Sequence, residues 1–524
     1  MRRTVAAAAL ALASCRCGSP ADPPASTTLA VRVTDRGVPV GARVLLLRDG
    51  EPLRIGTIDL YGKRQGASAC RIAPGVVGSW DGLILATGTG DIPVGGGDGC
   101  NPSPGIPYGR YRVVAWRGIE YERWEGEVDL SAERGRVELA IPLARAWTPH
   151  GTLAADLHVH AQASNDSTVP NPQRVIAQAA AGIQVIGLSD HNKNGDLDAE
   201  IAELGLTDRI ESIAGNELTS EQLHVNVYPV TGQSPPADRL VKASAEQMFA
   251  IARAMPNRPI IQVNHPRFRV TALFDARGWN GTSWPPPFSL DFDAVEVIAG
   301  YSAFNVAGDR RLDDSARDYA TLLDHGHLIA PLGNSDTHDL NWVLDGTART
   351  YVFVDDPRVA PFDEAAFIAA IRARRVVATT GPWLDIEVAR ERGATPTAGP
   401  GRGLAATGTA WVDVTLAQAG FVHAERIRIL VGGPAGPRLA QLVDVPSGAR
   451  THRWAGAVEV GDRDTWILIV ADGDRAMPLE QTGTYQRDKW NHEGVTPFAI
   501  SGPILIDADG DGRWKRGDAD VALP

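Results

Sequence analysis

The chain has 524 residues, of which 44% are hydrophobic and 22% are charged, and its formal net charge is −12 at pH 7. This composition is that of a globular protein of about three domains, and it excludes wholesale disorder. The acidic balance argues against nucleic acid as a partner, because phosphate backbones are bound by clustered lysine and arginine.

Residues 1–26 are typical of an export signal followed by a Pro/Ser-rich tether. Arg2 and Arg3 precede a short apolar stretch that cannot span a bilayer. Residues 12–15, Leu-Ala-Ser-Cys, resemble the bacterial lipoprotein box, which implies lipidation of Cys15. A plain secretory signal is the alternative. We expect export to the bacterial cell envelope, with membrane attachment only through the lipid anchor.

Residues 27–147 are predicted to form a β-sandwich-like domain. Short Val- and Leu-rich runs such as "TLAVRVTD", "ARVLLLRD" and "YRVVAWRG" alternate with Gly, Asp and Pro. In an oxidising compartment Cys70 and Cys100 have the option of forming a disulfide, although spacing alone is equally compatible with two free thiols.

Residues 148–382 have a different sequence pattern from the residues before them. Apolar runs such as "IQVIGL", "PIIQVN", "AVEVIA" and "HLIAPLG" alternate with Ala-rich helical stretches, including "PQRVIAQAAAG", "ASAEQMFAIARAM" and "ARDYATLLDHG". Apolar strands that alternate with helices predict a parallel sheet covered by helices. Over this length the pattern favours an α/β fold of the (β/α)-barrel type.

Residues 383–524 return to strand-like runs and are predicted to form a C-terminal β domain. Near its end, "DADGDGRWKRGD" places Asp507, Asp509, Asp511 and Asp518 at the ligand spacing of an EF-hand-like loop. A structural Ca²⁺ is one interpretation of this segment. A hydrated Asp/Gly turn is the other.

Histidines and carboxylates gather where the central apolar runs end. In "DLHVH" His158 and His160 are two residues apart, so in a strand their imidazoles share one face, an arrangement that suits a transition metal. The later runs end in Asp190 and His191, in Glu217, in His265, and in Asp336 and His338. Because barrel chemistry lies at the carboxyl ends of strands, these residues are candidate metal ligands.

A second His-x-His pair is a useful contrast. His325 and His327 precede a strand-like run, at the end of a predicted helix, and are expected to satisfy helix-end carbonyls or to face solvent. His150, His423, His452 and His492 are expected to be surface or β-domain residues.

In this order, "DLHVHAQASND", "VIGLSDH", "GNE", "NHP" and "GNSDTH" resemble the PHP (polymerase and histidinol phosphatase) domain, and the frame around them resembles its CehA/McbA-like metallohydrolase branch. The resemblance implies a distorted (β/α)7 barrel between the two β modules, holding up to three metal ions. The implied ligands are His158, His160, Asp166, His191, Glu217, His224, His265, Asp336 and His338. Asp190 is expected to orient a ligating imidazole.

The mixed nitrogen and oxygen ligand set predicts two or three divalent transition metal ions, Zn, Mn or Fe. A metal-bound hydroxide would then cleave an ester, carbamate, amide or phosphoester bond of a small molecule. We assign catalytic roles to Glu217 as a bridge, to His191, His338 or Asp336 as proton donor, and to Arg349 as a substrate contact. Asn334 and Thr380 are weaker candidates for lining the mouth.

Two alternatives stay open at this point. The first is a PHP-type phosphatase or phosphodiesterase. The second is a non-catalytic cell-surface binding protein built around a degenerate barrel.

Overall fold

The computed structural model describes residues 27–53, 55, 70–79, 82–95, 106–267, 271–283, 289–300, 311–483, 494–517 and 519–523. Outside this description lie Cys15, Cys100, His492, Asp518 and the side chain of Cys70. The structure therefore does not bear on the predicted lipidation, on the disulfide, or on Asp518 as a ligand of the EF-hand-like loop. Among the described helices, none combines the length and apolar character needed to cross a membrane.

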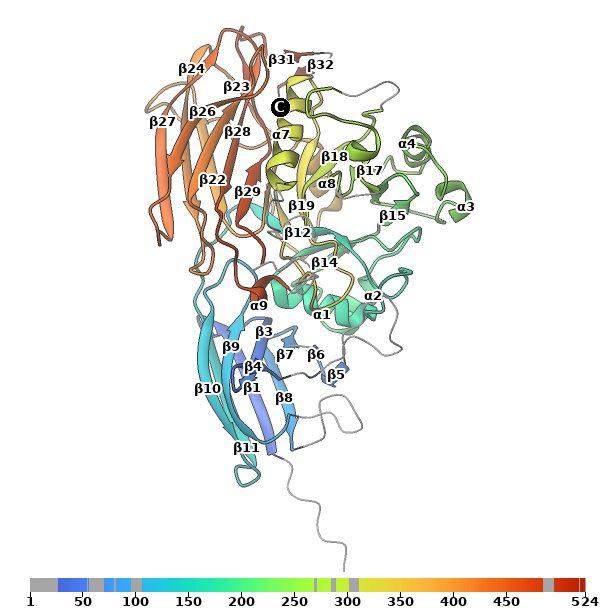
Figure 1. Cartoon of the computed structure of the whole chain (residues 1–524), viewed down its shortest axis with the longest axis vertical. Coiled ribbons are helices and arrows are strands. Elements are labelled where there is room, and N and C mark those ends of the chain that lie inside the picture. The colour runs from blue at the N-terminus through green and yellow to red at the C-terminus, as the bar shows by residue number, and fades with distance from the viewer. Residues whose placement is uncertain are drawn as a thin grey trace, which may run out of the picture.

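The N-terminal module contains strands and no described helix, as its alternating runs predict, and it occupies the lower part of Figure 1. Its two sheets share one core that includes Leu29, Val44 and Val113. One sheet contains β1 (Thr27–Asp35), β2 (Val38–Pro39), β8 (Thr89–Val94) and β11 (Arg136–Leu143). The other contains β3 (Ala42–Arg48), β4 (Glu51–Pro52), β5 (Cys70–Ala73), β6 (Val76–Ser79), β7 (Gly82–Leu85), β9 (Gly109–Trp116) and β10 (Trp124–Leu130).

The central region is mixed α/β, and its strands fall into two sheets. The first holds β12 (Thr152–Val159), β13 (Val185–Leu188), β14 (Glu211–Ile213), β20 (Arg349–Phe353) and β21 (Val376–Thr379). The second holds β15 (Asn216–Thr219), β16 (His224–Tyr228), β17 (Ile260–Val263), β18 (Ala294–Ala299) and β19 (Ala330–Asn334). Among the described strands, the ladders do not close into a continuous barrel.

Strand direction also departs from the all-parallel expectation. Pairing is parallel between β12 and β13, β17 and β18, and β18 and β19. However, β16 is antiparallel to both of its neighbours, and β20 is antiparallel to β12 and β21. Residues 220–223 are too few to form the crossover that a parallel β15–β16 pair requires, so these strands form a hairpin.

The predicted helices are present around these sheets. The Ala-rich stretches form α1 (Asn171–Ala181), α4 (Ala245–Arg253) and α7 (Arg311–Asp324). The left-handed Gly182, with φ of 83°, ends α1. The remaining described helices are α2 (Asp198–Glu203), α3 (Ala237–Leu240), α5 (Leu273–Ala276), α8 (Glu364–Arg372) and α9 (Leu479–Thr482).

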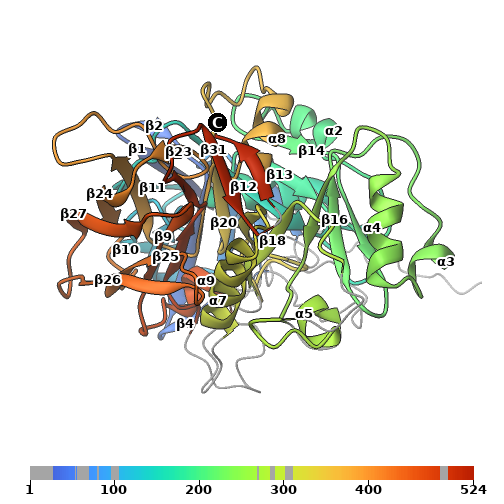
Figure 2. The same cartoon turned by 90° about the horizontal axis from the view of Figure 1, so that it is seen from above.

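The C-terminal β region lies on the side of the molecule opposite α3 and α4 (Figures 1 and 2). A sheet of β22 (Trp383–Ala389), β24 (Gly408–Ala417) and β27 (Thr451–Gly461) shares a core with strands that extend the first central sheet. Those strands are β23 (Gly403–Ala405), β25 (Arg426–Val431), β26 (Arg438–Asp444), β28 (Thr465–Asp472), β29 (Phe498–Ser501) and β30 (Ile504–Asp507). The final hairpin pairs β31 (Arg513–Arg516) with β32 (Ala519–Ala522).

One sheet therefore runs through the central and C-terminal regions without a break. The link is β29, which pairs antiparallel with β21 on one side and with β28 on the other. The sequence predicts separate domains that meet near residue 382, whereas the hydrogen-bonded sheet crosses that boundary.

Candidate metal centre

The nine side chains that the sequence predicts as metal ligands lie together, and most of them come from the carboxyl ends of the central strands. His158 is the penultimate residue of β12, whereas Glu217 lies within β15 and His224 begins β16. The others lie in the segments that follow strands: His160 and Asp166 after β12, His191 after β13, His265 after β17, and Asp336 and His338 after β19.

Three overlapping groups of ligand atoms make up the cluster. They are His160, Asp166, His191 and His338; His158, His160 and Glu217; and His191, Glu217 and His224. Within each group the ligand atoms all lie within 4.8 Å of one another. The two remaining residues adjoin these groups, because His158 Nε2 is 3.1 Å from Asp336 Oδ1 and His265 Nε2 is 3.7 Å from Glu217 Oε1. Glu217 belongs to two of the three groups.

The way these atoms meet fits a shared cation better than hydrogen bonding. His160 Nε2 lies 3.2 Å from Asp336 Oδ1 and 3.5 Å from Glu217 Oε2, yet within the described structure both His160 Nε2 and Glu217 Oε2 are buried without hydrogen-bond geometry to any partner. Ligand atoms around a tetrahedral metal at about 2.0–2.1 Å are themselves roughly 3.3 Å apart. Buried histidine and carboxylate side chains of this kind could hold a metal ion.

Backbone strain also concentrates here. Asp336 and His265 have positive φ angles of 53° and 29°, in a region that non-glycine residues rarely adopt. Such conformations cost about 1–3 kcal/mol each and persist where surrounding structure enforces them, most often at functional sites.

Burial and charge divide the imidazoles into two sets. Burial, reinforced by the neighbouring His338 and His191, lowers the pKa of His160 to about 3. For His191, burial opposes the charged form, but the carboxylates of Glu217 and Asp166 outweigh it and raise the pKa to about 10. The pKa of His338 is raised in the same way, against burial, by Asp166 and Asp336.

The carboxylates respond in the opposite direction. Burial favours the neutral form of Glu217, but His191, His224 and His158 overcome it, so the pKa of Glu217 lies well below its ordinary value. The groups that lower this pKa most are imidazoles, which must give up their protons to bind a metal. A bound cation would therefore replace protons as the counter-charge of Glu217.

Hydrogen bonds outside the cluster orient individual rings. His160 Nδ1 lies 3.1 Å from Ser164 Oγ, and His338 Nδ1 lies 2.9 Å from the carbonyl oxygen of Asp336. Contacts of this kind at one ring nitrogen fix the ring and leave the other nitrogen directed at the metal side.

A polar layer beneath the cluster was missed by reasoning from the sequence. Asn264 Nδ2 donates to Glu217 Oε1 at 2.8 Å and to Asn226 Oδ1 at 2.8 Å. Glu296 Oε1 lies 2.8 Å from His158 Nδ1. The run "AVEVIA" did contain a signal, because a carboxylate in the middle of a buried strand must have polar partners.

No family model matches the chain, and no curated protein and no solved structure is similar to it. The site is therefore interpreted from its own chemistry.

Three weaker expectations need correction. Asp190 accepts a hydrogen bond from the backbone N–H of Ala161 at 2.7 Å, so it supports the segment after His160 and not an imidazole. Asn334 is fully buried and hydrogen-bonds the backbone of Leu157. Thr380 is also buried, and its hydroxyl donates to the carbonyl oxygen of Thr496 at 2.8 Å. Neither side chain lines an open mouth.

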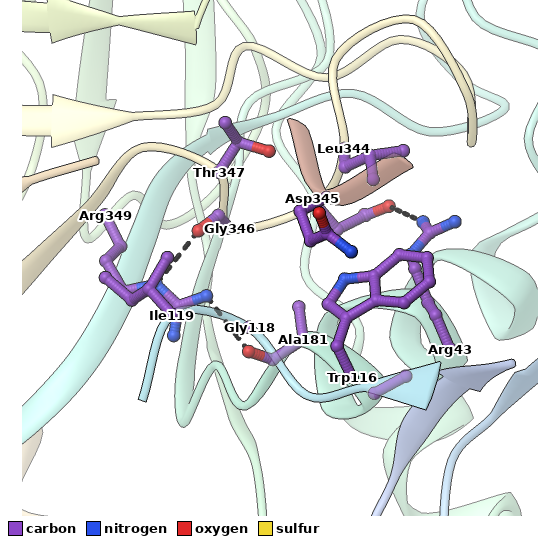
Figure 3. Close-up of a pocket in the computed structure, with 12 residues that line it drawn as sticks. Arg43, Trp116, Gly118, Ile119, Ala181, Leu344, Asp345, Gly346, Thr347 and Arg349 are labelled. Atoms are coloured by element: carbon purple, nitrogen blue, oxygen red, sulfur yellow. Dashed lines mark hydrogen bonds and ion pairs between the residues drawn. The ribbon is translucent and has the colours of Figure 1, made fainter. Parts of the chain in front are cut away.

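Arg349 is held by two backbone carbonyl groups (Figure 3). Its Nε donates to the carbonyl oxygen of Gly346 at 2.9 Å, and Nη2 donates to that of Ala181 at 3.0 Å. The residue is 1% exposed and lines a small pocket of about 10 Å³, which has room for about one water molecule. This position does not suit the substrate contact that the sequence suggested.

The acidic segment near the C-terminus forms a different group from the predicted one. Asp507 and Asp509 lie with Asp464, and these three could hold a cation, whereas Asp511 forms an ion pair with Lys515. Asp507 ends β30 and β31 follows, so the segment joins two strands and is not a helix–loop–helix. Its occupancy by Ca²⁺ stays a prediction.

The contrasting histidine pair behaves as expected. His325 directly follows α7, and its Nε2 lies 3.1 Å from the carbonyl oxygen of Thr282. The pair precedes β19, whereas Asp336 and His338 follow it, so the two sets lie at opposite ends of that strand.

Proposed function

We propose that this protein is a metal-dependent hydrolase of the PHP type that acts on a small-molecule ester, carbamate or amide. The observation that carries the proposal is the convergence of six imidazoles and three carboxylates, among which the buried His158 Nε2, His160 Nε2 and Glu217 Oε2 face one another without hydrogen-bond geometry. This donor set suits two or three Zn, Mn or Fe ions and is poor for Mg²⁺ or Ca²⁺, which prefer oxygen ligands.

Bound divalent ions would lower the pKa of a water molecule and neutralise charge that develops on the substrate oxygen. Differences in exposure among these side chains indicate the side from which a substrate would approach. The side chains of His158, His160 and Glu217 are at most 1% exposed and form the closed side of the cluster. Asp166 and His338 are 27% and 13% exposed and form the open side.

Proton transfer to the leaving group would take place at this open side. His191 Nε2 and His338 Nε2 each lie 3.1 Å from Asp166 Oδ2. Asp166 thereby holds both rings at the rim, where an imidazole that is not committed to a cation is placed to donate a proton.

The position of Arg349 favours an uncharged acyl substrate over a phosphoester. Recognition of a phosphoryl group commonly uses a guanidinium in bidentate fashion. Here the Nε and Nη2 of Arg349 are occupied by backbone carbonyl oxygens. A PHP-type phosphoesterase is the second possibility, and the substrate panel below separates the two.

We further propose that strands from the two central sheets together form the distorted seven-stranded barrel of the PHP domain. Two isolated bridges support this arrangement, one between Val159 and Thr337 and one between His191 and Glu217. Each joins one sheet to the other close to the cluster. Export and lipid anchoring through Cys15 belong to the same proposal and depend on the sequence of residues 1–26.

The proposal is tested by metal analysis of the purified protein, followed by hydrolysis assays with 1-naphthyl N-methylcarbamate, p-nitrophenyl phosphate and bis-p-nitrophenyl phosphate. We expect metal in the wild type and turnover of the carbamate in preference to the phosphoesters. The His158→Ala/His160→Ala variant should lose both metal and activity, while the matched His325→Ala/His327→Ala variant should keep both. Metal-loaded protein that hydrolyses none of these substrates would favour the binding-protein alternative.

A further inference from the structure

We infer that Glu296, which the nine-residue ligand set does not include, is a positioning residue that holds two metal ligands at once. The inference rests on the proposed metal centre and deepens it. Glu296 is the third residue of β18 and its side chain is fully buried, so it has no solvent to satisfy its charge.

Three groups besides His158 donate hydrogen bonds to this carboxylate. The backbone N–H of His265 donates to Oε2 at 2.8 Å, and Asn334 Nδ2 and Gln262 Nε2 donate to Oε1 at 2.9 and 3.1 Å. The Asn334 amide is oriented by the backbone N–H of Leu157, which donates to its Oδ1 at 2.9 Å. Glu296 is therefore an acceptor on both oxygens, which is the role of an ionised carboxylate.

This assignment determines which nitrogen of His158 carries a proton. The remaining contact of Glu296 Oε1 is His158 Nδ1 at 2.8 Å, so Nδ1 donates. The opposite nitrogen, Nε2, then faces Asp336 Oδ1 at 3.1 Å and Glu217 Oε1 at 3.2 Å, on the metal side of the ring. A carboxylate behind a ligating histidine fixes the tautomer and raises the basicity of the ligand.

The same carboxylate also fixes the second ligand through its backbone. The hydrogen bond from His265 N to Glu296 Oε2 anchors a residue whose φ is 29°. His158 comes from β12 and His265 follows β17, so a side chain on β18 aligns ligands from two different sheets. Loss of Glu296 should therefore disturb the positions of both His158 and His265.

The test is the Glu296→Gln variant, which keeps the shape but replaces one acceptor oxygen with an NH₂ donor. In either orientation this NH₂ group faces another donor, which is the backbone N–H of His265 at one oxygen position or the donors at the other. We expect the dissociation constant for Zn²⁺, measured by chelator competition, to rise about 10–100-fold. The visible absorption of the Co²⁺-substituted variant should also change, because the ligand field at His158 changes.

Two further variants separate positioning from folding. Asp318→Asn is the matched control, because Asp318 is a buried carboxylate of the same region that accepts from Arg267 Nε at 2.6 Å and Trp279 Nε1 at 2.7 Å. It should lower the melting temperature of the metal-free protein without changing Zn²⁺ affinity. Glu296→Asp keeps the charge and should recover part of the lost affinity.

The outcomes are distinguishable. If the wild type binds metal and Glu296→Gln binds it equally tightly with an unchanged Co²⁺ spectrum, the inference is overturned and the proposed function stands. Equal losses of affinity in Glu296→Gln, Glu296→Asp and Asp318→Asn would also overturn it, because the effect would then come from general destabilisation. A wild-type chain that binds no metal would overturn the proposed function and this inference with it.

Discussion

Positive charge is unevenly shared among the imidazoles of the candidate metal centre. Burial disfavours the charged form of five of these rings, yet the surrounding carboxylates raise the pKa of His158, His191 and His338, while burial lowers the pKa of His160 and His224. At neutral pH the metal-free cluster therefore carries a proton on His191, whose pKa is about 10. Metal ligands must lose such protons before they coordinate.

We predict that binding of Zn²⁺ at pH 7 releases at least one proton per chain, because the pKa of His191 is raised to about 10 and this ring must lose its proton to coordinate a metal. A raised histidine pKa means that the proton is held more tightly and must be displaced by the metal, so affinity rises with pH and falls as pH decreases. Calorimetric titrations in buffers of different ionisation enthalpy measure the number released. Binding without proton release would contradict the charge distribution described here.

At the scale of elements, local sequence rules explain α4 well. Ser244 caps the helix by accepting from the N–H of Gln247, and the Gln247 side chain accepts from the N–H of Ser244, which forms a capping box. The helix then buries Met248, Phe249 and Ala252 in the core around the second central sheet.

We predict that Ser244→Ala destabilises the protein by about 1 kcal/mol, because a helix-terminal N–H loses its acceptor. Urea denaturation followed by circular dichroism measures the change. Ser244→Thr retains the hydroxyl and should stay close to the wild type. Since α4 supplies no metal ligand, an accompanying loss of metal affinity would show that the effect is not confined to the cap.

The elements that the sequence predicted correctly are those with local signals. The Ala-rich periodic stretches became α1, α4 and α7, and the ligand-type residues after apolar runs converged. His158 and His160 could be placed because two residues on one strand face share a direction. These inferences need only strand ends and periodicity, which are properties of short segments.

The features that the sequence did not predict depend on contacts between distant segments. Glu296 contacts His158, which is 138 positions away in the sequence. Asp464, which lies between β27 and β28, groups with Asp507 at the end of β30. Arg349 resembled a substrate ligand, but its partners Gly346 and Ala181 are known only from the fold. Pairing of β29 with β21 likewise joins residues more than a hundred positions apart. Periodicity contains no information on such partners.

At the scale of the whole molecule, the unbroken sheet makes the C-terminal region part of the fold that holds the candidate metal centre. We predict that a chain of residues 27–382 is poorly soluble, because β21 loses its partner β29 and becomes an unpaired edge. Soluble yield and gel filtration against residues 27–524 measure this. A monodisperse 27–382 fragment that binds Zn²⁺ as tightly as the longer chain would show that the boundary predicted from sequence is also a folding boundary.

The N-terminal module is tied to the candidate metal centre by a buried chain of charged side chains. Arg43 of β3 donates from Nη2 to Asp345 Oδ2 at 3.1 Å, and Arg174 of α1 donates from Nη1 to Asp345 Oδ1 at 2.6 Å. Arg174 Nε also donates to the carbonyl oxygen of His160 at 2.9 Å. These three charged side chains are at most 5% exposed, so their attraction is little screened by solvent.

This chain of charges predicts an order of stabilities. Asp345→Ala leaves two buried guanidinium groups without their carboxylate and should cost about 3–5 kcal/mol. Arg43→Met leaves Asp345 paired with Arg174 and should cost about 1–3 kcal/mol. Arg136→Ala is the matched control in the same module, because Arg136 and its partners Asp91 and Glu138 are exposed and such ion pairs contribute little to stability.

Denaturation of the three variants measures this order, and Zn²⁺ affinity shows whether the effect reaches the cluster. Because Arg174 also donates to the carbonyl oxygen of Asp339, next to His338, Asp345→Ala should weaken metal binding, whereas Arg136→Ala should leave it unchanged. If Arg43→Met were as mild as Arg136→Ala, the N-terminal module would be an independent attachment. The predicted order instead makes it a support for the segments that carry His160 and His338.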